Sequence, residues 1–180
     1  MKVRSYCDVV VGNYPDAKSF AEELKPILEN ETITVGHTNV KATIHTVWNY
    51  LPDHPEVINF KKFITKEVDK HFNPPGIEGE KANVIQNEFW GNVYTKGDYA
   101  QSHHHIPNSI SLVYFLKAKW YDSPLVFSDF NEKVEPEEGK YVLFPSHIHH
   151  HVPIHKFEHK RITLSSNFVI CMPHLSHLYE

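Results

Sequence analysis

The chain has 180 residues, of which 41% are hydrophobic and 22% are charged, a balance typical of a single globular domain that excludes wholesale disorder. Its 18 Lys and Arg against 22 Asp and Glu give a formal net charge of −4, which disfavours a general binder of nucleic-acid backbones. The longest apolar run, residues 110–116, is far below the roughly 20 residues that cross a bilayer, so no membrane partner is expected. The absence of a signal-peptide pattern and the two lone cysteines, Cys7 and Cys171, indicate a cytoplasmic protein without disulfides.

Two helices are expected in the first half of the chain. Residues 15–30 begin at Pro15-Asp16 and carry apolar side chains at helical spacing, namely Phe20, Leu24, Ile27 and Leu28. Residues 54–72 repeat the pattern with Val57, Ile58, Phe60, Phe63, Ile64 and Val68, before Asn73-Pro74-Pro75-Gly76 ends the helix. Residues 40–48, between the two helices, are predicted to form a strand.

After residue 80 the sequence changes to short β-rich runs separated by turn residues. The predicted strands are residues 82–94, 99–105, 110–117, 124–127, 140–144, 148–152 and 161–170, and the acidic stretch 132–138 is expected to be a solvated turn. Many short strands with regular turns favour a sandwich or barrel. The fold class we predict is mainly β with N-terminal helices: a double-stranded β-helix, the jelly roll that cupins share, in a single domain over residues 1–180.

Histidine is unusually abundant, with 15 residues, and nine of these fall within residues 103–105 and 147–159. Because side chains alternate along a strand, His103 and His105 share one face. His150 shares a face with Ile148 and Val152, which should point into the barrel, whereas His147, His149 and His151 should point outward. Imidazole is a common metal ligand, so residues 81–171 are predicted to form a metal-binding core and residues 1–80 a helical flank with the first strands. Zinc, iron, copper and nickel all accept such ligands.

The segment from Asn92 to His105 resembles the metal-binding motif of AlkB-type 2-oxoglutarate/iron(II) oxygenases, N-x-Y-x2-G-x5-H-x-D. Asn92, Tyr94, Gly97 and His103 occupy its fixed positions, and His105 stands where the motif has aspartate. Residues 83–168 also resemble a family of small 2-oxoglutarate/iron(II) oxygenases of phages and bacteria. The resemblance rests on four segments in order: Trp90-Gly91-Asn92, His103 to His105, Phe144-Pro145-Ser146 with His150, and Arg161-Ile162-Thr163.

The resemblance implies that Fe(II) is bound by His103, His105 and His150, with open positions for 2-oxoglutarate and O2. Arg161 and Thr163 would hold the distal carboxylate of 2-oxoglutarate, and Asn92 and Tyr94 would also hydrogen-bond this cosubstrate. An arginine suits the first role because its planar fork binds carboxylates bidentately. The implied activity is hydroxylation of an unidentified small molecule or peptide with release of succinate and CO2. The implied location is the cytoplasm of a bacterium or a phage-infected host.

Three alternatives are left open. Asp98 or Asp129 could supply a carboxylate ligand in place of His105. Gly97 with His103 and His105, and Gly139 with Pro145 and His150, also partly match the two cupin motifs, although the glutamate of the first motif is missing. A cupin-type metal dioxygenase or isomerase is therefore the enzymatic alternative. The third is a non-catalytic metal-binding jelly-roll module. A test with Fe(II) and 2-oxoglutarate separates the three.

Overall fold

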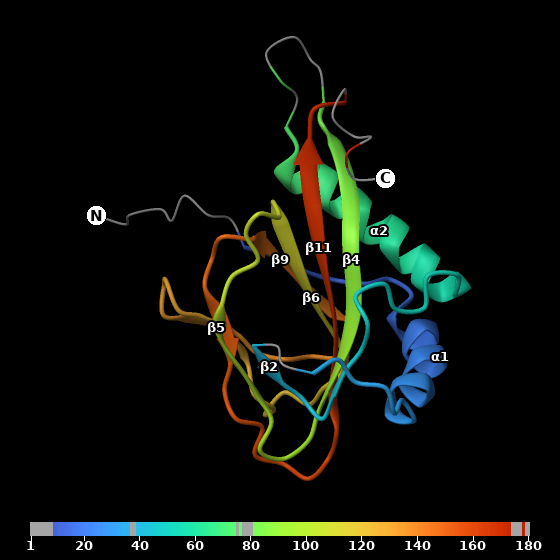
Figure 1. Ribbon diagram of the computed structural model, residues 1–180, viewed down its shortest axis with the longest axis vertical. Helices are drawn as coiled ribbons and strands as arrows, with labels where there is room; N and C mark the ends of the chain where they lie inside the picture. Colours follow the sequence, from blue (N-terminus) through green and yellow to red (C-terminus); the bar gives the residue numbers. More distant parts are fainter. Residues whose placement is uncertain (1–8, 37–38, 75, 77–80, 174–177, 179–180) are drawn as a thin grey trace.

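The computed structural model describes residues 9–36, 39–74, 76, 81–173 and 178 (Figure 1). Two helices and a series of antiparallel strands follow one another along the chain. In order they are β1 (Val10–Asn13), α1 (Ala17–Glu29), β2 (Val40–Lys41), β3 (Ile44–His45), α2 (Pro55–Phe72), β4 (Asn83–Tyr94), β5 (Tyr99–His103), β6 (Ile110–Lys117), β7 (Leu125–Phe127), β8 (Glu132–Val134), β9 (Lys140–Pro145), β10 (His150–Val152) and β11 (Arg161–Cys171).

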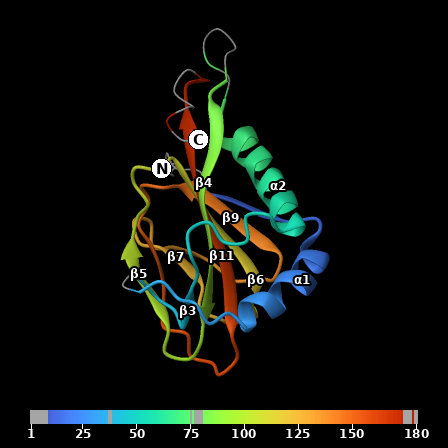
Figure 2. The same cartoon turned by 45° about the vertical axis from the view of Figure 1, so that its right-hand side comes forward.

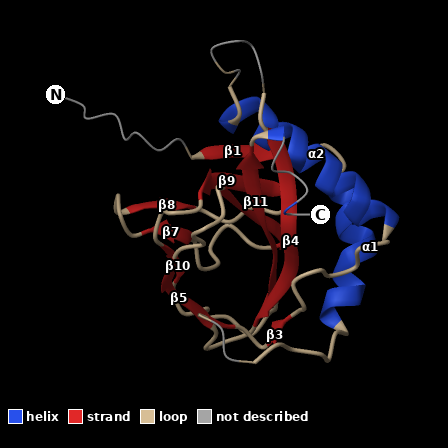
Figure 3. Cartoon of the chain, turned by 45° about the horizontal axis from the view of Figure 1, so that its top comes forward, coloured by secondary structure: helices blue, strands red, loops and turns tan. Residues whose placement is uncertain are grey.

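The strands form two sheets that face each other. The larger has six strands in the order β1-β9-β6-β11-β4-β3, and the smaller has five in the order β2-β5-β10-β7-β8. Figure 3 shows α1 and α2 outside the larger sheet, on the side away from the smaller one. The predicted mainly β jelly roll with N-terminal helices is therefore confirmed. The single domain over residues 1–180 stays a prediction.

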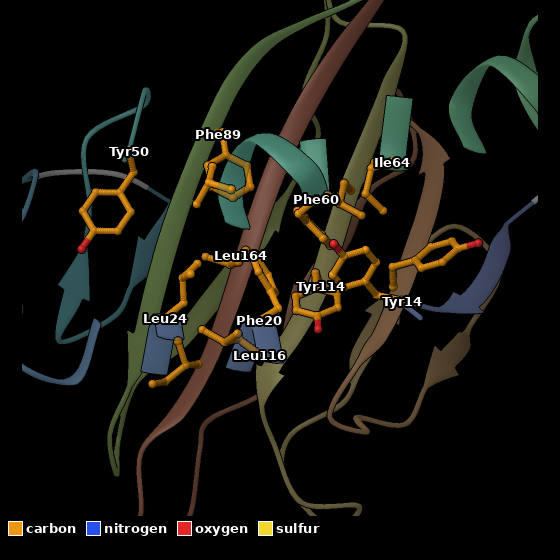
Figure 4. Close-up of a cluster of buried hydrophobic side chains, with 14 of the residues drawn as sticks. Tyr14, Phe20, Leu24, Tyr50, Phe60, Ile64, Phe89, Tyr114, Leu116 and Leu164 are labelled. Carbon is orange, nitrogen blue, oxygen red and sulfur yellow. The ribbon is translucent and has the colours of Figure 1, made fainter. Parts of the chain in front are cut away.

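The larger sheet is buried on both faces, which explains why its strands carry almost continuous apolar runs. Along β6, Leu112, Tyr114 and Leu116 belong to the cluster that packs under the helices (Figure 4). Val113 and Phe115, which alternate with them, belong to a second cluster between the two sheets. Strand alternation thus separates a helix-covered outer core from an inner one that borders the candidate site.

The same alternation sets the two faces of β4 and β11, the longest pair in the structure. Phe89 and Val93 of β4 and Ile162 and Leu164 of β11 join the outer core. Gly91 lies between Phe89 and Val93 in sequence, and a Cβ added to Gly91 would come within 2.7 Å of Leu28 Cδ2 on α1. Glycine at this position therefore permits the close approach of α1 to the sheet, and the other faces of β4 and β11 are left for the interior.

Several predicted elements differ in detail. Residues 40–48 form two short strands in different sheets, β2 and β3, because the chain turns at Thr43. There the backbone N–H and the hydroxyl of Thr43 both donate to Asp98 Oδ2, each at 2.7 Å. β1 was not predicted, and part of the expected acidic turn is the edge strand β8, whose charged residues suit an exposed edge. Within the described ranges, neither helix combines the length and the apolarity needed to cross a bilayer.

Candidate active site

Three histidines from the smaller sheet meet on its inner side. His103 ends β5 and lies directly opposite His150, which begins β10. The ring centroids are 4.4 Å apart for this pair, 4.9 Å for His103 and His105, and 5.1 Å for His105 and His150. One ligand atom from each of the three lies within 4.8 Å of the others. Figure 2 shows β5 on the side of the molecule opposite the two helices.

Backbone carbonyls orient two of these rings. Nδ1 of His103 lies 2.6 Å from the Gln101 carbonyl oxygen, and Nδ1 of His150 lies 3.1 Å from the Ile148 carbonyl oxygen. A proton on each Nδ1 would be donated to the carbonyl, which leaves Nε2 of both rings as a lone-pair donor. His105 follows the strand end, and its backbone N–H donates to the Ser146 carbonyl at 2.8 Å. The contacts between Nδ1 and a backbone carbonyl in His103 and His150 are of the kind that fixes the tautomer of metal-ligating histidines.

Burial keeps the three imidazoles neutral. Desolvation lowers the pKa of His103, lowers that of His105 to about 3, and lowers that of His150 well below its usual 6.5. The neighbouring imidazoles add to the effect, because a second positive charge nearby is unfavourable. A cluster that resists protonation but offers three lone pairs is suited to a cation.

Arg161 is the second feature of the pocket. Its side chain is 0% exposed, and none of its three guanidinium nitrogens has a hydrogen-bond partner among the described residues. Its Cζ lies 4.9 Å from the centroid of the Tyr94 ring and 5.3 Å from that of the Phe115 ring. Burial lowers the pKa of Arg161, although the neighbouring Tyr94 hydroxyl and the Asp122 carboxylate oppose the shift. An arginine this deeply buried without an ion pair is a site prepared for an anion.

The cross-strand register surrounds Arg161 with polar side chains. On the inner face of the β4–β11 pair, Arg161 lies opposite Tyr94, Thr163 opposite Asn92, and Ser165 opposite Trp90. All six side chains line one pocket together with the three histidines. The pocket also has unsatisfied groups, since Asn92 Oδ1 and Trp90 Nε1 are buried without a hydrogen-bond partner in the described part of the chain. The predicted cosubstrate residues and the predicted metal ligands thus border the same cavity.

The carboxylate alternatives find no support in the geometry. Asp98 Oδ2 accepts hydrogen bonds from Thr43 and Thr95 and so anchors a turn. Asp129 is exposed and accepts a hydrogen bond from the His149 backbone N–H. In the ranges that the structure describes, two side-chain groups have a spacing suited to a metal, and neither contains Asp98 or Asp129. One is His103, His105 and His150, and the other is Asp122, His155 and His159.

The remaining histidines of the two windows lie mainly outside the pocket. His104, His147 and His149 are exposed and His151 is half-buried, as strand alternation predicted for the last three. The sequence analysis missed Trp90 and Ser165 as pocket residues, although the two-residue period that runs through Asn92 and Thr163 points to both. It also assigned no role to Asp122, His155 and His159. Asp122 gives no signal in the sequence, because it lies more than thirty residues from either histidine.

No protein-family model and no curated protein matches the sequence. Solved structures do match. A viral collagen prolyl hydroxylase of Paramecium bursaria Chlorella virus-1, in complex with 2-oxoglutarate, is 14% identical with a TM-score of 0.65, covering 92% of this chain and 96% of that one. A Pseudomonas putida prolyl-4-hydroxylase is 15% identical with a TM-score of 0.64, covering 91% and 92%. HygX of Streptomyces hygroscopicus, with nickel, 2-oxoglutarate and hygromycin B bound, is 12% identical with a TM-score of 0.61, covering 91% and 82%. The resemblance noted in the sequence is therefore matched in three dimensions, and the chain has the double-stranded β-helix fold of the 2-oxoglutarate/iron(II) oxygenases.

Proposed function

We propose that the protein is a 2-oxoglutarate-dependent iron(II) oxygenase that hydroxylates a small molecule or a peptide. The observation that carries the proposal is the buried, unpartnered guanidinium of Arg161 in the same pocket as three converging imidazoles. A histidine cluster alone fits many metal proteins. A cation-binding cluster combined with a buried anion-binding fork fits a cosubstrate that chelates the metal at one end and carries a carboxylate at the other.

In this proposal His103, His105 and His150 hold Fe(II). Three neutral imidazoles leave the full charge of the metal in place, so the anionic 2-oxoglutarate would supply the negative charge that a carboxylate ligand supplies elsewhere. The guanidinium of Arg161 would pair with the distal carboxylate, and the hydroxyl of Thr163, two residues along the same face, would donate to it. Asn92 and Tyr94 lie opposite these two residues and would contact the same molecule.

The apolar walls complete the site. The rings of Tyr94 and Phe115 both lie within cation–π distance of the guanidinium of Arg161. Val113, Leu125 and Val152 line the pocket and would exclude water from the charged contacts, which strengthens them. The bound iron would supply the oxygen chemistry, in which decarboxylation of 2-oxoglutarate to succinate and CO2 is coupled to hydroxylation of the substrate.

An aromatic wall suggests where the substrate would bind. Trp90 lines the pocket with its ring centroid 5.8 Å from that of His105. The ring centroid of Trp48, a residue that is 42% exposed, lies 4.9 Å from that of Trp90. These rings lead from the histidines to the surface and would pack against an apolar or ring-shaped part of the substrate. The structural neighbours include a viral collagen prolyl hydroxylase and HygX with hygromycin B bound, so both peptides and small molecules enter the substrate screen.

The test uses Fe(II) and 2-oxoglutarate without oxygen. Their addition to the metal-free protein should give a weak visible metal-to-ligand charge-transfer band, and oxygen should then release succinate. His150→Ala should remove the iron that 2-oxoglutarate chelates and so abolish the band, whereas His71→Gln, a change to an exposed histidine of α2, should leave both intact. Iron binding with no band and no succinate would refute the proposal in favour of a cupin-type enzyme. Failure to bind iron at all would favour a binding module.

A further inference from the structure

A second group of metal-ligating side chains lies outside the pocket. Asp122 follows β6, and His155 and His159 belong to the loop between β10 and β11. One ligand atom from each of the three lies within 4.8 Å of the others. The group combines two imidazoles and a carboxylate, a donor set that Zn²⁺ and other divalent first-row ions accept readily.

The three donors are unusually well enclosed for a loop cluster. The carboxylate of Asp122 is fully buried, and its Oδ2 accepts a hydrogen bond of 2.9 Å from the Lys119 backbone N–H. The other oxygen, Oδ1, lies 2.7 Å from His159 Nε2. Tyr121 and Phe157 contact the His159 ring at centroid distances of 6.0 Å and 5.6 Å. Two aromatic rings therefore flank the His159 ligand, and the Asp122 carboxylate is closed off from solvent.

His155 supplies the observation that points to a ligand. Its ring is 0% exposed, and its Nε2 lies 2.9 Å from the His159 carbonyl oxygen, to which an Nε2 proton would be donated. Its Nδ1 is buried without a hydrogen-bond partner among the described residues. In that tautomer Nδ1 carries a lone pair that no proton donor among the described residues satisfies, and a cation would accept it.

The cluster also joins the loop between β6 and β7 to the loop between β10 and β11. The backbone of His155 bonds the turn after β4 on both sides: its N–H donates to the Asp98 carbonyl at 2.7 Å, and its carbonyl accepts from the Gly97 N–H at 2.8 Å. Asp122 brings in the loop between β6 and β7, and His159 stands two residues before Arg161. An ion bound here would cross-link these two loops beside the start of β11, where Arg161 enters the pocket.

We propose that Asp122, His155 and His159 form a second, structural divalent-cation site, for which Zn²⁺ is the fitting ion. The ion takes the place of the proton that joins His159 to Asp122, and it satisfies the buried nitrogen of His155. A water molecule completes a tetrahedral site with three protein ligands. The proposal does not depend on iron or 2-oxoglutarate at the first site, because it rests on separate residues.

The test counts zinc ions per chain. Metal-free protein is dialysed to equilibrium against Zn²⁺, and bound zinc is measured by mass spectrometry of the metal. The wild-type protein should bind two ions. Variants His159→Gln and His150→Ala should each bind one, by losing different sites, and the combined variant should bind none. His71→Gln is the matched control, because His71 also pairs with a carboxylate, Glu67 at 3.5 Å, yet belongs to neither cluster, and it should still bind two.

Anomalous diffraction at the zinc edge, from crystals of the wild-type protein grown with Zn²⁺, gives a readout that no folding defect can obscure. A peak between Asp122, His155 and His159 is the expected result. The proposal is overturned if that position shows no peak. It is equally overturned if the wild-type protein binds a single zinc that His150→Ala removes, or if His159→Gln still binds two.

Discussion

Replacing Arg161 with methionine separates the stability of the protein from its proposed function. The guanidinium is fully buried next to the rings of Tyr94 and Phe115, and none of its nitrogens has a hydrogen-bond partner in the described part of the chain. Methionine is apolar and flexible enough to occupy the same space. Replacement of buried charged groups by well-packed apolar side chains of similar volume is often neutral or stabilising, by up to about 4 kcal/mol. We therefore expect Arg161→Met to raise the free energy of unfolding of the ligand-free protein by up to that amount.

The same substitution should weaken the binding of 2-oxoglutarate. A bidentate pair with the distal carboxylate of 2-oxoglutarate consists of two hydrogen bonds between charged groups, each contributing about 1.5–3 kcal/mol. Their loss amounts to about 3–6 kcal/mol, or a 2-oxoglutarate Kd that is roughly 10² to 10⁴ times higher. Urea unfolding of the ligand-free protein measures the first effect, and anaerobic calorimetric titration of the iron-loaded protein with 2-oxoglutarate measures the second.

Lys62→Met is the matched control, because it removes a cation from an exposed position on α2. It should change neither quantity appreciably. A variant at Arg161 that is less stable than the wild type would refute the view that this charge lacks a partner in the free protein. An unchanged affinity for 2-oxoglutarate would remove Arg161 from the cosubstrate site whatever its effect on stability.

Four further outcomes are expected. Thr163→Val should weaken 2-oxoglutarate binding by about 1 kcal/mol, whereas Thr163→Ser, which keeps the hydroxyl, should not; titration calorimetry of both variants distinguishes a hydrogen bond from packing. His105→Asp should bind as much iron per chain as the wild type, measured by metal analysis, since two histidines and a carboxylate also suit Fe(II), and a variant that binds less iron would contradict the proposed ligand set. Gly91→Ala should lower the free energy of unfolding by about 1–3 kcal/mol, because the added Cβ would lie 2.7 Å from Leu28 Cδ2. Urea unfolding measures this change, and a variant as stable as the wild type would show that α1 can shift. The metal-free protein should lose stability as the pH falls from 6.5 towards 3, by up to about 1.4 kcal/mol per pH unit from His105 alone. The reason is that burial lowers the pKa of His105 to about 3, so the unfolded chain binds the proton at a higher pH than the folded protein does. Urea unfolding at pH 6.5 and pH 5 should show a smaller loss of stability for His105→Asn than for the wild type.

The sequence predicted best where one periodicity governs a whole element. The two-residue period placed His150 with Ile148 and Val152 on the inner face, and these three side chains are 4%, 0% and 7% exposed. The same rule put Arg161 and Thr163 on a common face, where the structure has them. These assignments need no knowledge of partner strands, because alternation along a strand is fixed by the backbone itself.

What the sequence could not predict depends on contacts between distant segments. Residues 40–48 divide between two sheets because Thr43 bonds to Asp98, 55 residues away. β1 consists of four residues whose place is set by pairing with β9. The cluster of Asp122 with His155 and His159 likewise forms only when two loops meet. No local sequence pattern predicts such contacts between distant segments, and the resemblance to known oxygenases did not predict them either.

The position of the helices explains how the fold tolerates an unsatisfied pocket. β4 and β11 present Phe89, Val93 and Leu164 to α1 and α2, in a core whose members are almost completely buried. Their opposite faces carry buried groups without partners among the described residues, of which Arg161 and Trp90 Nε1 are two. Burial of apolar surface on one face offsets the cost of unpaired polar groups on the other. Since both faces belong to the same strands, weakening the outer core should move the pocket residues as well. The two helices therefore support the positions of the pocket residues, although neither helix contributes to the pocket lining.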